Sequence, residues 1–373
     1  MNIVLIGPAF PWRGGIAHST ALLARHLAKH HTVRVITFKR LYPEILFPGT
    51  SQKETSATVP PVSAEQLIDS LNPLTWIRTA RRISDLRPDL VLFKYWHPFF
   101  ALCFAALASH VRRKTRSRIL FVCDNILPHE PFPGSRAFAR IAFRYGHGFI
   151  VLSETVRKDL LSLFPRARHL LVPHPIYELF TGAMSKQKAR RRLRIGESRV
   201  LLFFGLVRPY KGLDILLRAL PLVLRSMPVR LLIVGEFYDK ESQYRELLRT
   251  LGCSESVTVV PTYVPAEEVG VYFSACDAVV LPYRSATQSG IVQIAYQFNK
   301  PVITTNVGGL AEAVLHGSTG YVVSPEQPLE LAEAILEFYR KKKEGGFVKN
   351  IRREKKRFSW GHLVRAVEEL ASP

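Results

Sequence analysis

The sequence predicts an α/β protein with two doubly wound domains in tandem, each built on a parallel β-sheet. Two observations lead to this prediction. Short apolar segments of strand length alternate with helical segments along most of the chain. The length of 373 residues also exceeds the size at which a single hydrophobic core usually stops growing. A basic, polar stretch over residues 174–198 interrupts the alternation and reads as the linker between the two domains.

The first half of the chain shows the alternation from its first residues. An apolar strand over 3–6 is followed by a loop that contains Gly14 and Gly15, and then by a helix over 16–29 with a leucine and alanine face. Ser153 is placed to cap a helix that runs to residue 163. Residues 40–75 are rich in Pro, Ser and Thr and read as an extended loop. Further buried strands are expected over 33–38, 90–93, 119–122 and 149–152.

A second alternating series starts near Val200 and indicates a second sheet with its own covering helices. Its strands are expected over 200–204, 229–234, 257–260, 278–281 and 302–304. Its helices are expected over 213–224, 244–251, 269–274 and 292–298. The carboxyl ends of parallel strands carry the loops of such domains, so a ligand is expected in the cleft where two such edges face each other.

The charge of the chain points to an anionic partner. Lys and Arg number 52 against 30 Asp and Glu, which gives a net charge of +22. Such a field attracts nucleotide diphosphates, anionic lipid surfaces or nucleic acid, although basic side chains also serve solubility alone. No nucleic-acid-binding motif is present, so we expect no nucleic-acid partner. The four cysteines form no CxxC pair, and no His, Cys and Asp set has metal-ligand spacing, so we expect neither a metal site nor a disulfide framework.

The apolar segments predict a cytoplasmic protein and leave peripheral binding to a membrane surface open. The longest apolar stretch, Pro98–Ala108, has 11 residues, whereas a spanning helix needs about 20. The N-terminus lacks the features of a signal peptide. Residues 98–118 combine an apolar helix with a basic RRKTRSR segment, a pattern that fits peripheral binding to an anionic membrane surface. The alternative is a core helix with a solvated end.

The segment 203–220, FFGLVRPYKGLDILLRAL, has the composition of a phosphate-binding loop. A buried strand ends at Gly205, a short loop carries Arg208 and Lys211, and Gly212 precedes an amphipathic helix. This order places two cations and a helix N-terminus near one point, where the charge of a diphosphate leaving group would be stabilised. Arg208 suits forked contact with phosphate and Lys211 acts as a point charge. The alternative is an ordinary strand–turn–helix with solvated charges.

The same segment resembles the phosphate-binding loop of glycosyltransferase family 4, whose usual form is Gly-Arg-Leu followed by Lys-Gly. Leu206 stands where the family has its arginine, and Arg208 is expected to replace it. Other resembling segments follow in the family's order over nearly the whole chain: residues 8–20, 150–161, 172–176, 301–323 and 357–370. The resemblance implies a retaining enzyme with the two-domain GT-B fold and no metal requirement.

The resemblance also implies a separate role for each domain. The N-terminal, acceptor-side domain would comprise residues 1–175 together with a closing helix over 358–373 that packs back onto it. The donor-binding domain would comprise residues 176–357. Gly14 and Gly15 would let the backbone approach the donor phosphates or the acceptor. Glu312 would lie near the nucleotide, with a helix-start carboxylate as the alternative.

One departure from the family concerns its two glutamates, which are spaced by seven residues and implied to contact donor hydroxyls. The segment 282–303 contains no glutamate, and either Ala286 or Thr287 takes the first place. Either Ile294 or Ala295 takes the second place. The side chains of Gln288 and Ser289 still offer hydrogen bonds to hydroxyls. Ser289, Gly290 and Ile291 precede a helix, so their backbone N–H groups are expected to hold phosphate.

A second candidate site follows the strand that ends at Cys123. The family often has a histidine at the position of Asp124, near the anomeric centre, so Asp124 is expected to act there, with His129 and Glu130 as alternates. An Asx-turn role for Asp124 is the other interpretation. Trp96 and His97 follow another strand end and are candidates for an acceptor pocket, with core packing and an ordinary loop histidine as their alternatives.

These observations together predict a retaining glycosyltransferase. The donor would be a nucleotide-diphosphate sugar, and the acceptor a growing polysaccharide or a lipid-linked saccharide. Two other functions remain open from the sequence. A nucleotide-sugar epimerase on the same fold would need acid and base carboxylates in the cleft. A degenerate GT-B protein that binds sugar without catalysis would account for the missing glutamates.

Overall fold

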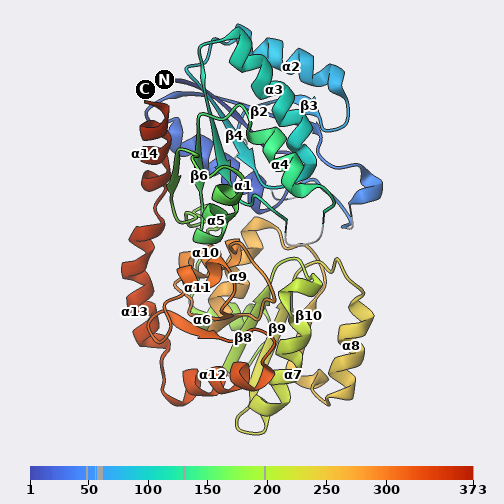
Figure 1. Cartoon of the computed structure of the whole chain (residues 1–373). Helices are drawn as coiled ribbons and strands as arrows, with labels where there is room; N and C mark the ends of the chain where they lie inside the picture. Colours follow the sequence, from blue (N-terminus) through green and yellow to red (C-terminus); the bar gives the residue numbers. More distant parts are fainter. Residues whose placement is uncertain (48, 55, 57–61, 129–131, 197–198, 373) are drawn as a thin grey trace. The chain divides into compact units, whose positions relative to one another are not determined.

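The computed structural model confirms an α/β chain with two parallel sheets (Figure 1). It describes residues 1–373 except 48, 55, 57–61, 129–131, 197–198 and 373. The chain divides into two compact units. Unit 1 consists of Met1–Pro175 with Phe358–Pro373, and unit 2 consists of Ile176–Arg357.

Unit 1 is built on a seven-stranded parallel sheet with the order β3-β2-β1-β4-β5-β6-β7. The central strand β4 is buried along its whole length, because helices cover both faces of a doubly wound sheet. Such strands are nearly continuous apolar runs in the sequence, and they could therefore be predicted from it. The strands are β1 (Asn2–Ile6), β2 (Thr32–Arg40), β3 (Ala64–Asp69), β4 (Leu90–Tyr95), β5 (Arg118–Cys123), β6 (Gly148–Val151) and β7 (His169–Leu171).

The interpretation of residues 40–75 as one extended loop was wrong. Strand β3 lies within this range and pairs in parallel with β2, in a register that joins Val35 to Ala64. Its sequence AEQLID is half polar because β3 is an edge strand, and most of its side chains are only partly buried. Helix α2 also begins within the range, at Pro73, with Asn72 accepting a hydrogen bond from the backbone N–H of Leu74 as the N-terminal cap.

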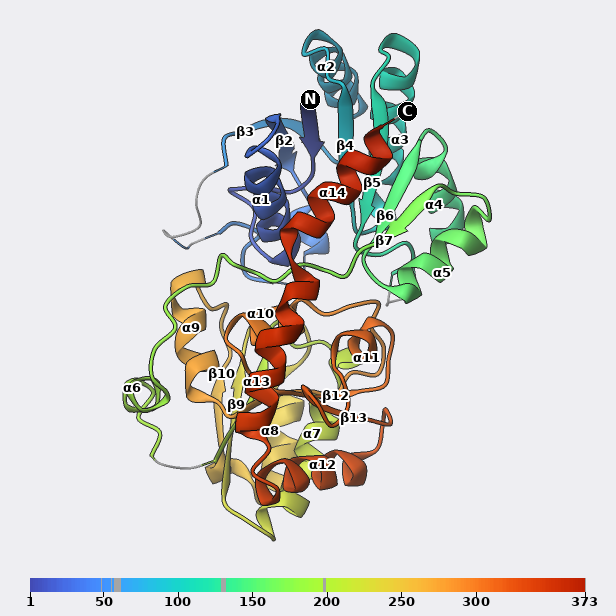
Figure 2. The same cartoon turned by 90° about the vertical axis from the view of Figure 1, so that its left-hand side faces the viewer.

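The helices of unit 1 cover the two faces of its sheet. Helices α2 to α5 contribute to one hydrophobic core with the strands, while α1 and α14 lie side by side on the other face (Figure 2). The predicted return of the C-terminal helix is confirmed: α14 also packs on β5 and β6. The helices are α1 (Gly15–Leu27), α2 (Pro73–Asp85), α3 (Ala101–Lys114), α4 (Ser135–Phe143), α5 (Glu154–Leu163) and α14 (Trp360–Ala371), with short turns η1 (Glu44–Leu46) and η2 (Pro98–Phe100).

Unit 2 is built on a six-stranded parallel sheet with the order β10-β9-β8-β11-β12-β13. The strands are β8 (Arg199–Phe204), β9 (Val229–Val234), β10 (Val257–Val260), β11 (Ala278–Leu281), β12 (Val302–Thr305) and β13 (Gly320–Val323). The helices are α6 (Lys186–Arg192), α7 (Leu213–Leu224), α8 (Glu241–Thr250), α9 (Ala266–Ala275), α10 (Gly290–Gln297), α11 (Gly309–Ala313), α12 (Pro328–Arg340) and α13 (Glu344–Glu354), with turns η3 (Pro209–Lys211), η4 (Ser254–Ser256) and η5 (Lys355–Phe358).

Buried ion pairs fix the linker helix α6 to the body of unit 2. Asp277 is almost fully buried and accepts hydrogen bonds from the side chains of Lys186, at 2.6 Å, and Arg190, at 2.9 Å. It also accepts the backbone N–H of Val200 at the start of β8. The first helix of the unit is therefore held on its first strand. Among the described residues, no helix is both long and apolar enough to cross a membrane.

Candidate active site

The turn after β8 has the geometry that its glycines require. The backbone of Gly205 has φ +101° and that of Gly212 has φ +64°, both in the left-handed region that favours glycine. A Cβ atom on Gly212 would lie 2.1 Å from the carbonyl oxygen of Pro282. The chain therefore approaches the segment after β11 so closely that only glycine fits. Between the two glycines lies η3, which carries Lys211.

The two cations of this turn rest against aromatic rings. The Lys211 ammonium lies 5.6 Å from the centroid of Tyr283, and the Arg208 guanidinium lies 4.9 Å from that of Tyr238. Lys211 is only 8% exposed. Burial and the neighbouring charge of Arg208 lower the pKa of Lys211 to about 7. Within the described part of the chain, no carboxylate lies at ion-pair distance from Lys211, so an anion would supply the missing charge.

Arg284 joins this turn to the segment after β11. Its backbone N–H donates to the carbonyl of Tyr210, at 2.7 Å. Its guanidinium donates to the carbonyl of Pro209, at 2.8 Å, and to both carboxylate oxygens of Asp214, at 2.8 and 2.7 Å. Although burial acts to raise the pKa of Asp214, the hydrogen bond and charge of Arg284 lower it. Pro209 and Tyr210 of η3 and Asp214 of α7 are thus held by one residue that spacing along the sequence did not single out.

The N-terminus of α10 meets the same turn. Ser289 caps the helix by accepting the backbone N–H of Ile291, at 3.3 Å. A Cβ placed on Gly205 would lie 3.1 Å from Ile291 Cδ1 and 3.4 Å from Lys211 Nζ. Gly205, Lys211 and Ile291 therefore surround one point at the carboxyl edge of the sheet. The predicted phosphate loop and the predicted helix start are brought together by the fold.

The loop before α11 lies against the loop before α10. The backbone N–H of Gly309 donates to the carbonyl of Thr287, at 3.0 Å. A Cβ on Gly308 would overlap the carbonyl oxygen of Ala286, at 1.5 Å. Glu312, in α11, accepts a hydrogen bond from Arg357 through its backbone carbonyl. Gly308 is thus required by backbone packing, and it directly precedes the helix that carries Glu312.

In unit 1, Asp124 belongs to a buried charged cluster at the carboxyl ends of β4 and β5. Its Oδ2 lies 2.6 Å from Nζ of Lys94, whose side chain has no exposed surface. His174 Nε2 lies 4.0 Å from Oδ1 of the same carboxylate. Burial, with a further contribution from Lys94, lowers the pKa of His174 to about 4, so its ring is neutral at physiological pH. Its Nδ1–H donates to the carbonyl of Pro175, at 2.7 Å.

Family models match both units of the chain. The description "Glycosyl transferase 4-like domain" covers residues 14–175, and "Glycosyl transferases group 1" covers residues 198–341. Both units therefore belong to glycosyltransferase domain families. In unit 2, the match includes the whole turn from Gly205 to Gly212 and the helix starts of α10 and α11.

Curated relatives of this glycosyltransferase carry related names. A D-inositol 3-phosphate glycosyltransferase of Gordonia bronchialis is 29% identical over 235 residues, which are 58% of this chain and 50% of the relative. One of Pseudarthrobacter chlorophenolicus is 34% identical over 165 residues, 43% of this chain and 39% of the relative. The chain spans about half the length of the curated relatives it matches.

Solved structures share the fold of the glycosyltransferase along its whole length. HepE from Anabaena, solved in complex with UDP, aligns with a TM-score of 0.78 and 20% identity, over 100% of both chains. Sucrose-phosphate synthase from Thermosynechococcus elongatus aligns with a TM-score of 0.72 and 18% identity, over 99% of this chain and 97% of that one. These similarities establish the GT-B fold.

The residues that stand at the positions of the two family glutamates are buried in this glycosyltransferase. Thr287 is 5% exposed. The side chains of Ile294 and Ala295 lie in the buried part of α10, so either residue contributes apolar packing there. The sequence analysis also missed a buried glutamate at another strand end: Glu236 follows β9 after Gly235 and is 5% exposed. Its carbonyl accepts the backbone N–H of Val207, at 2.9 Å, beside Arg208. The signal was a Gly-Glu pair at a strand end.

The other predicted residues of unit 1 divide between open and packed positions. Gly14 has φ +101° and open space where a side chain would point, and Gly15 begins α1. Trp96 is 8% exposed, packs on Phe100 and donates from its indole N–H to Tyr42. His97 caps η2 by accepting the backbone N–H of Phe99. His129 and Glu130 lie outside the described residues.

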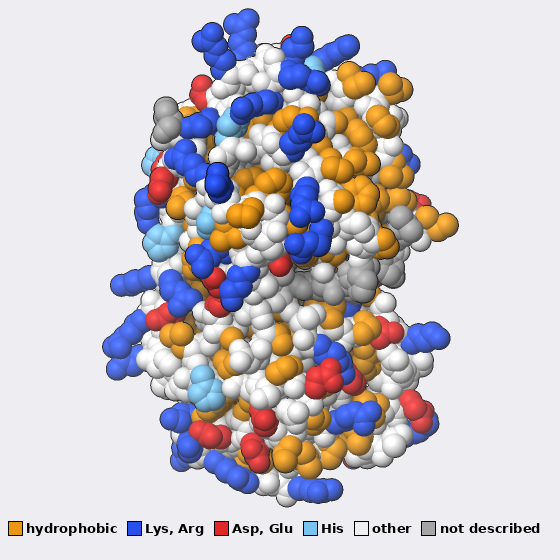
Figure 3. Space-filling model, viewed as in Figure 1, with side chains coloured by type: hydrophobic (Ala, Val, Ile, Leu, Met, Phe, Trp, Pro, Cys, Tyr) orange, Lys and Arg blue, Asp and Glu red, His pale blue; other side chains and the backbone are white. Residues whose placement is uncertain are grey.

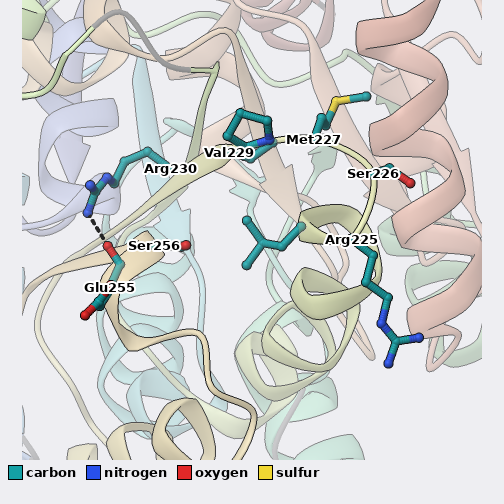
Figure 4. A pocket seen from close by; sticks show the side chains of 9 residues that line it. Arg225, Ser226, Met227, Val229, Arg230, Glu255 and Ser256 are labelled. Carbon is teal, nitrogen blue, oxygen red and sulfur yellow. Dashed lines mark hydrogen bonds between the residues drawn. The ribbon is translucent and has the colours of Figure 1, made fainter.

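A cavity of ≈ 580 Å³ lies at the other end of the unit 2 sheet (Figure 4). It is lined by the segment between α7 and β9 and by Glu255 and Ser256. Arg230 is directed to the carbonyl of Glu255 there, at 2.7 Å, while Arg225 is directed away. Because this cavity faces the amino end of β9, it is separate from the turn that holds Arg208 and Lys211. Among the described residues, no cluster of His, Cys, Asp or Glu is placed to hold a metal ion.

Proposed function

We propose that this chain transfers a sugar from a nucleotide-diphosphate sugar to a saccharide or lipid-linked saccharide, with retention at the anomeric carbon. The observation that carries the proposal is the buried Lys211 beside Arg208, in a turn that opens a helix at the carboxyl edge of a doubly wound sheet. The glycosyltransferase domain matches in both units support the reaction type, and the resemblance of the sequence to family 4 implies retention.

Charge stabilisation is the chemistry this turn would supply. When the bond between the anomeric carbon and the phosphate oxygen breaks, negative charge develops on the departing diphosphate. Lys211 and Arg208 would stabilise this charge, and a preorganised cation in a poorly solvated site is more effective than one in water. HepE was solved with UDP and with UDP-glucose, which supports a nucleotide sugar as donor here.

Other residues would frame the donor and the acceptor in this proposal. Gly14 and Gly15 would admit the donor phosphates or acceptor, and the 288–291 segment with Glu312 would border the nucleotide sugar. Glu236, whose backbone carbonyl bonds to Val207 beside Arg208, would contact a hydroxyl group of the donor. Asp124 would act near the reacting carbon, with His129 as the alternate. Its contact with Lys94 would hold the carboxylate in position there.

Trp96 and His97 would support the acceptor site by packing and would not contact the acceptor itself. Their hydrogen bonds to Tyr42 and to the Phe99 backbone support a packing role for both. We further propose that the reaction is metal-independent and takes place in the cytoplasm. Turnover that is unchanged by EDTA would support metal independence, and loss of turnover restored by a divalent cation would overturn it.

The test compares the purified protein with an Arg208→Ala, Lys211→Ala double variant. Nucleotide sugars are screened first by thermal shift, because a ligand that binds the native state raises the melting temperature, and then by turnover. The parent is expected to bind and transfer from at least one of them. The double variant should keep its fold and lose turnover by a factor of about 100 or more.

The matched control removes two arginines from α8, Arg245→Ala with Arg249→Ala, which pair with neighbouring glutamates on the surface. This control should retain turnover, which separates a specific loss from a general loss of charge. A parent that binds nucleotide sugars without turnover would instead be a degenerate sugar-binding protein. Isomerisation of the donor without transfer would indicate an epimerase.

A further inference from the structure

Exposed apolar side chains gather on the helices of unit 1 that cover one face of its sheet. In the described part of unit 2, Leu329 is the exposed large apolar residue, whereas unit 1 has many. Helix α3 contacts both α2 and α4, and hydrophobic side chains are frequent over this region at the upper right of Figure 3. We call the solvent-facing sides of these three helices the α2–α4 face. Its exposed apolar residues are Leu71, Leu74, Ile77, Leu102 and Ile141.

Helix α2 presents these residues on the side turned away from the core. Thr79, Ala80 and Ile83 form its buried side. Leu74 and Ile77, one turn apart on the opposite side, are 63% and 49% exposed. Leu71, directly before the helix, is 49% exposed. Side chains that contribute this little to the core, and that cluster on one surface, are typical of an interaction site.

The same face is strongly basic. The sequences of α2, α3 and α4 contain a single acidic residue, Asp85. Their basic residues are Arg78, Arg81, Arg82, Arg112, Arg113, Lys114, Arg136 and Arg140. Arg82 is paired with Glu65 of β3, and Arg78 and Arg81 continue the exposed stripe of Leu74 and Ile77 along the helix. An apolar segment and a cationic segment thus follow one another along one exposed line.

This arrangement differs from the one expected for residues 98–118. The apolar side chains of α3 are mostly buried, Phe104, Leu107 and Val111 among them, and Leu102 is its exposed leucine. Helix α3 is therefore a core helix that supplies charge at its C-terminal end. The exposed apolar side chains come mainly from α2 and the segment before it, and two of them, Leu71 and Leu74, lie in the range 40–75 that the sequence analysis interpreted as a loop.

We propose that the α2–α4 face docks on an anionic lipid bilayer. Leu71, Leu74 and Ile77 would enter the headgroup region, and Arg78 and Arg81 would contact lipid phosphates. Peripheral binding needs both signals, since buried apolar area and attraction to anionic lipid are each weak alone. The dearth of acidic side chains on this face favours an anionic surface over a neutral one. The proposal does not depend on the transferase reaction.

The experiment is co-sedimentation of the full chain with vesicles. One set contains phosphatidylcholine alone, and the other contains phosphatidylcholine mixed with phosphatidylglycerol. The parent is expected to sediment with the second set only, and less at high salt because exposed charges are screened. The double variants Leu74→Gln with Ile77→Gln, and Arg78→Gln with Arg81→Gln, should each bind roughly tenfold or more weakly.

Two controls match these variants in chemistry. Leu329→Gln removes an exposed leucine of unit 2, and Arg245→Gln with Arg249→Gln removes two exposed charges of α8; both should bind vesicles like the parent. Thermal melting verifies that every variant folds. Absence of binding to anionic vesicles would overturn the proposal, as would unchanged binding by both α2 variants. A parent dimer that dissociates in Leu74→Gln with Ile77→Gln, without vesicle binding, would show that a second copy covers this face.

Discussion

At the scale of single residues, the state of Lys211 determines how strongly the candidate site attracts an anion. Its ammonium group is buried beside a second cation, and both features favour loss of its proton. A bound diphosphate would reverse this preference by supplying negative charge. The lysine therefore takes up a proton when ligand binds at a pH above its free-state value of about 7.

This linkage predicts a pH-dependent affinity for nucleotide sugars. The diphosphate of a nucleotide sugar has no proton to lose near neutrality, so Lys211 is the group that changes. Between about pH 7 and pH 9, Kd is expected to rise by up to tenfold per pH unit, because one proton must be taken up from an increasingly proton-poor solution. Isothermal titration in buffers of different ionisation enthalpy would measure both Kd and the proton uptake.

The variant Lys211→Met provides the control, since it keeps the length of the side chain and removes its charge. Its affinity for nucleotide sugars should be low and should not change with pH over this range.

The buried Lys211 also affects the stability of the fold. Between pH 7 and the usual pKa of a lysine, the unfolded chain binds more protons than the folded chain, so the free energy of unfolding rises with pH. The burial of Lys211 therefore destabilises the fold most below pH 7. The variant should therefore melt higher than the parent at pH 6. A pH slope shared by both proteins would contradict the assignment.

At the scale of elements, Arg284 shows how two loops from different strands become one structure. It contacts the turn η3 through Pro209 and Tyr210, helix α7 through Asp214, and the loop after β13 through Glu326. The close approach of Gly212 to Pro282 occurs beside these bonds. The position of Lys211 depends on this set of contacts.

Replacing Arg284 by alanine should loosen η3 without removing either phosphate-facing cation. The planar fork of the guanidinium makes the paired contact with Asp214, which lysine does not reproduce. We expect KM for the nucleotide sugar to rise about tenfold for Arg284→Ala and less for Arg284→Lys, with KM for the acceptor unchanged. Steady-state kinetics with each substrate varied in turn would measure the effect. Equal changes in both KM values would argue for a general structural loss.

The elements also show which parts of the fold were predictable. Strands β4, β8 and β9 read correctly because burial on both faces leaves an almost continuous apolar run. The edge strands β3 and β7 were missed, since their partly exposed residues lack that run, and the short edge strand β13 was missed as well. Glycine and cation spacing located the turn at 205–212. Partners far apart in sequence, such as Lys94 with Asp124 or Arg284 with Asp214, had no local signal and required the structure.

At the scale of the whole molecule, the chain completes unit 1 with its last helix. The side chains of Trp360, Leu363, Val367 and Leu370 in α14 are at most 2% exposed. Trp360 stacks on His26, with ring centroids 5.4 Å apart, and His31 Nε2 lies 2.9 Å from Glu368. A hypothetical Cβ at Gly148 of β6 would lie 3.4 Å from Leu370 Cδ2, so helix and strand pack closely.

Truncation of one of these side chains should destabilise unit 1 selectively. For Leu370→Ala we expect a loss of about 2–5 kcal/mol, the usual cost of removing a buried leucine side chain. Differential scanning calorimetry should show a lower melting temperature for the transition assigned to unit 1, with that of unit 2 retained. The control Leu329→Ala, at a position 60% exposed, should change stability by less than about 0.5 kcal/mol. Equal effects of the two substitutions would contradict this account of α14.

The chain order of the two units has a consequence during synthesis. Ile176–Arg357 is a contiguous segment, so unit 2 has all its residues as soon as position 357 has left the ribosome. Unit 1 emerges first but lacks α14 until residues 360–371 have been synthesised, and until then the apolar surface of α1, β5 and β6 that α14 covers stays open. The domain made first is therefore the one that finishes folding last.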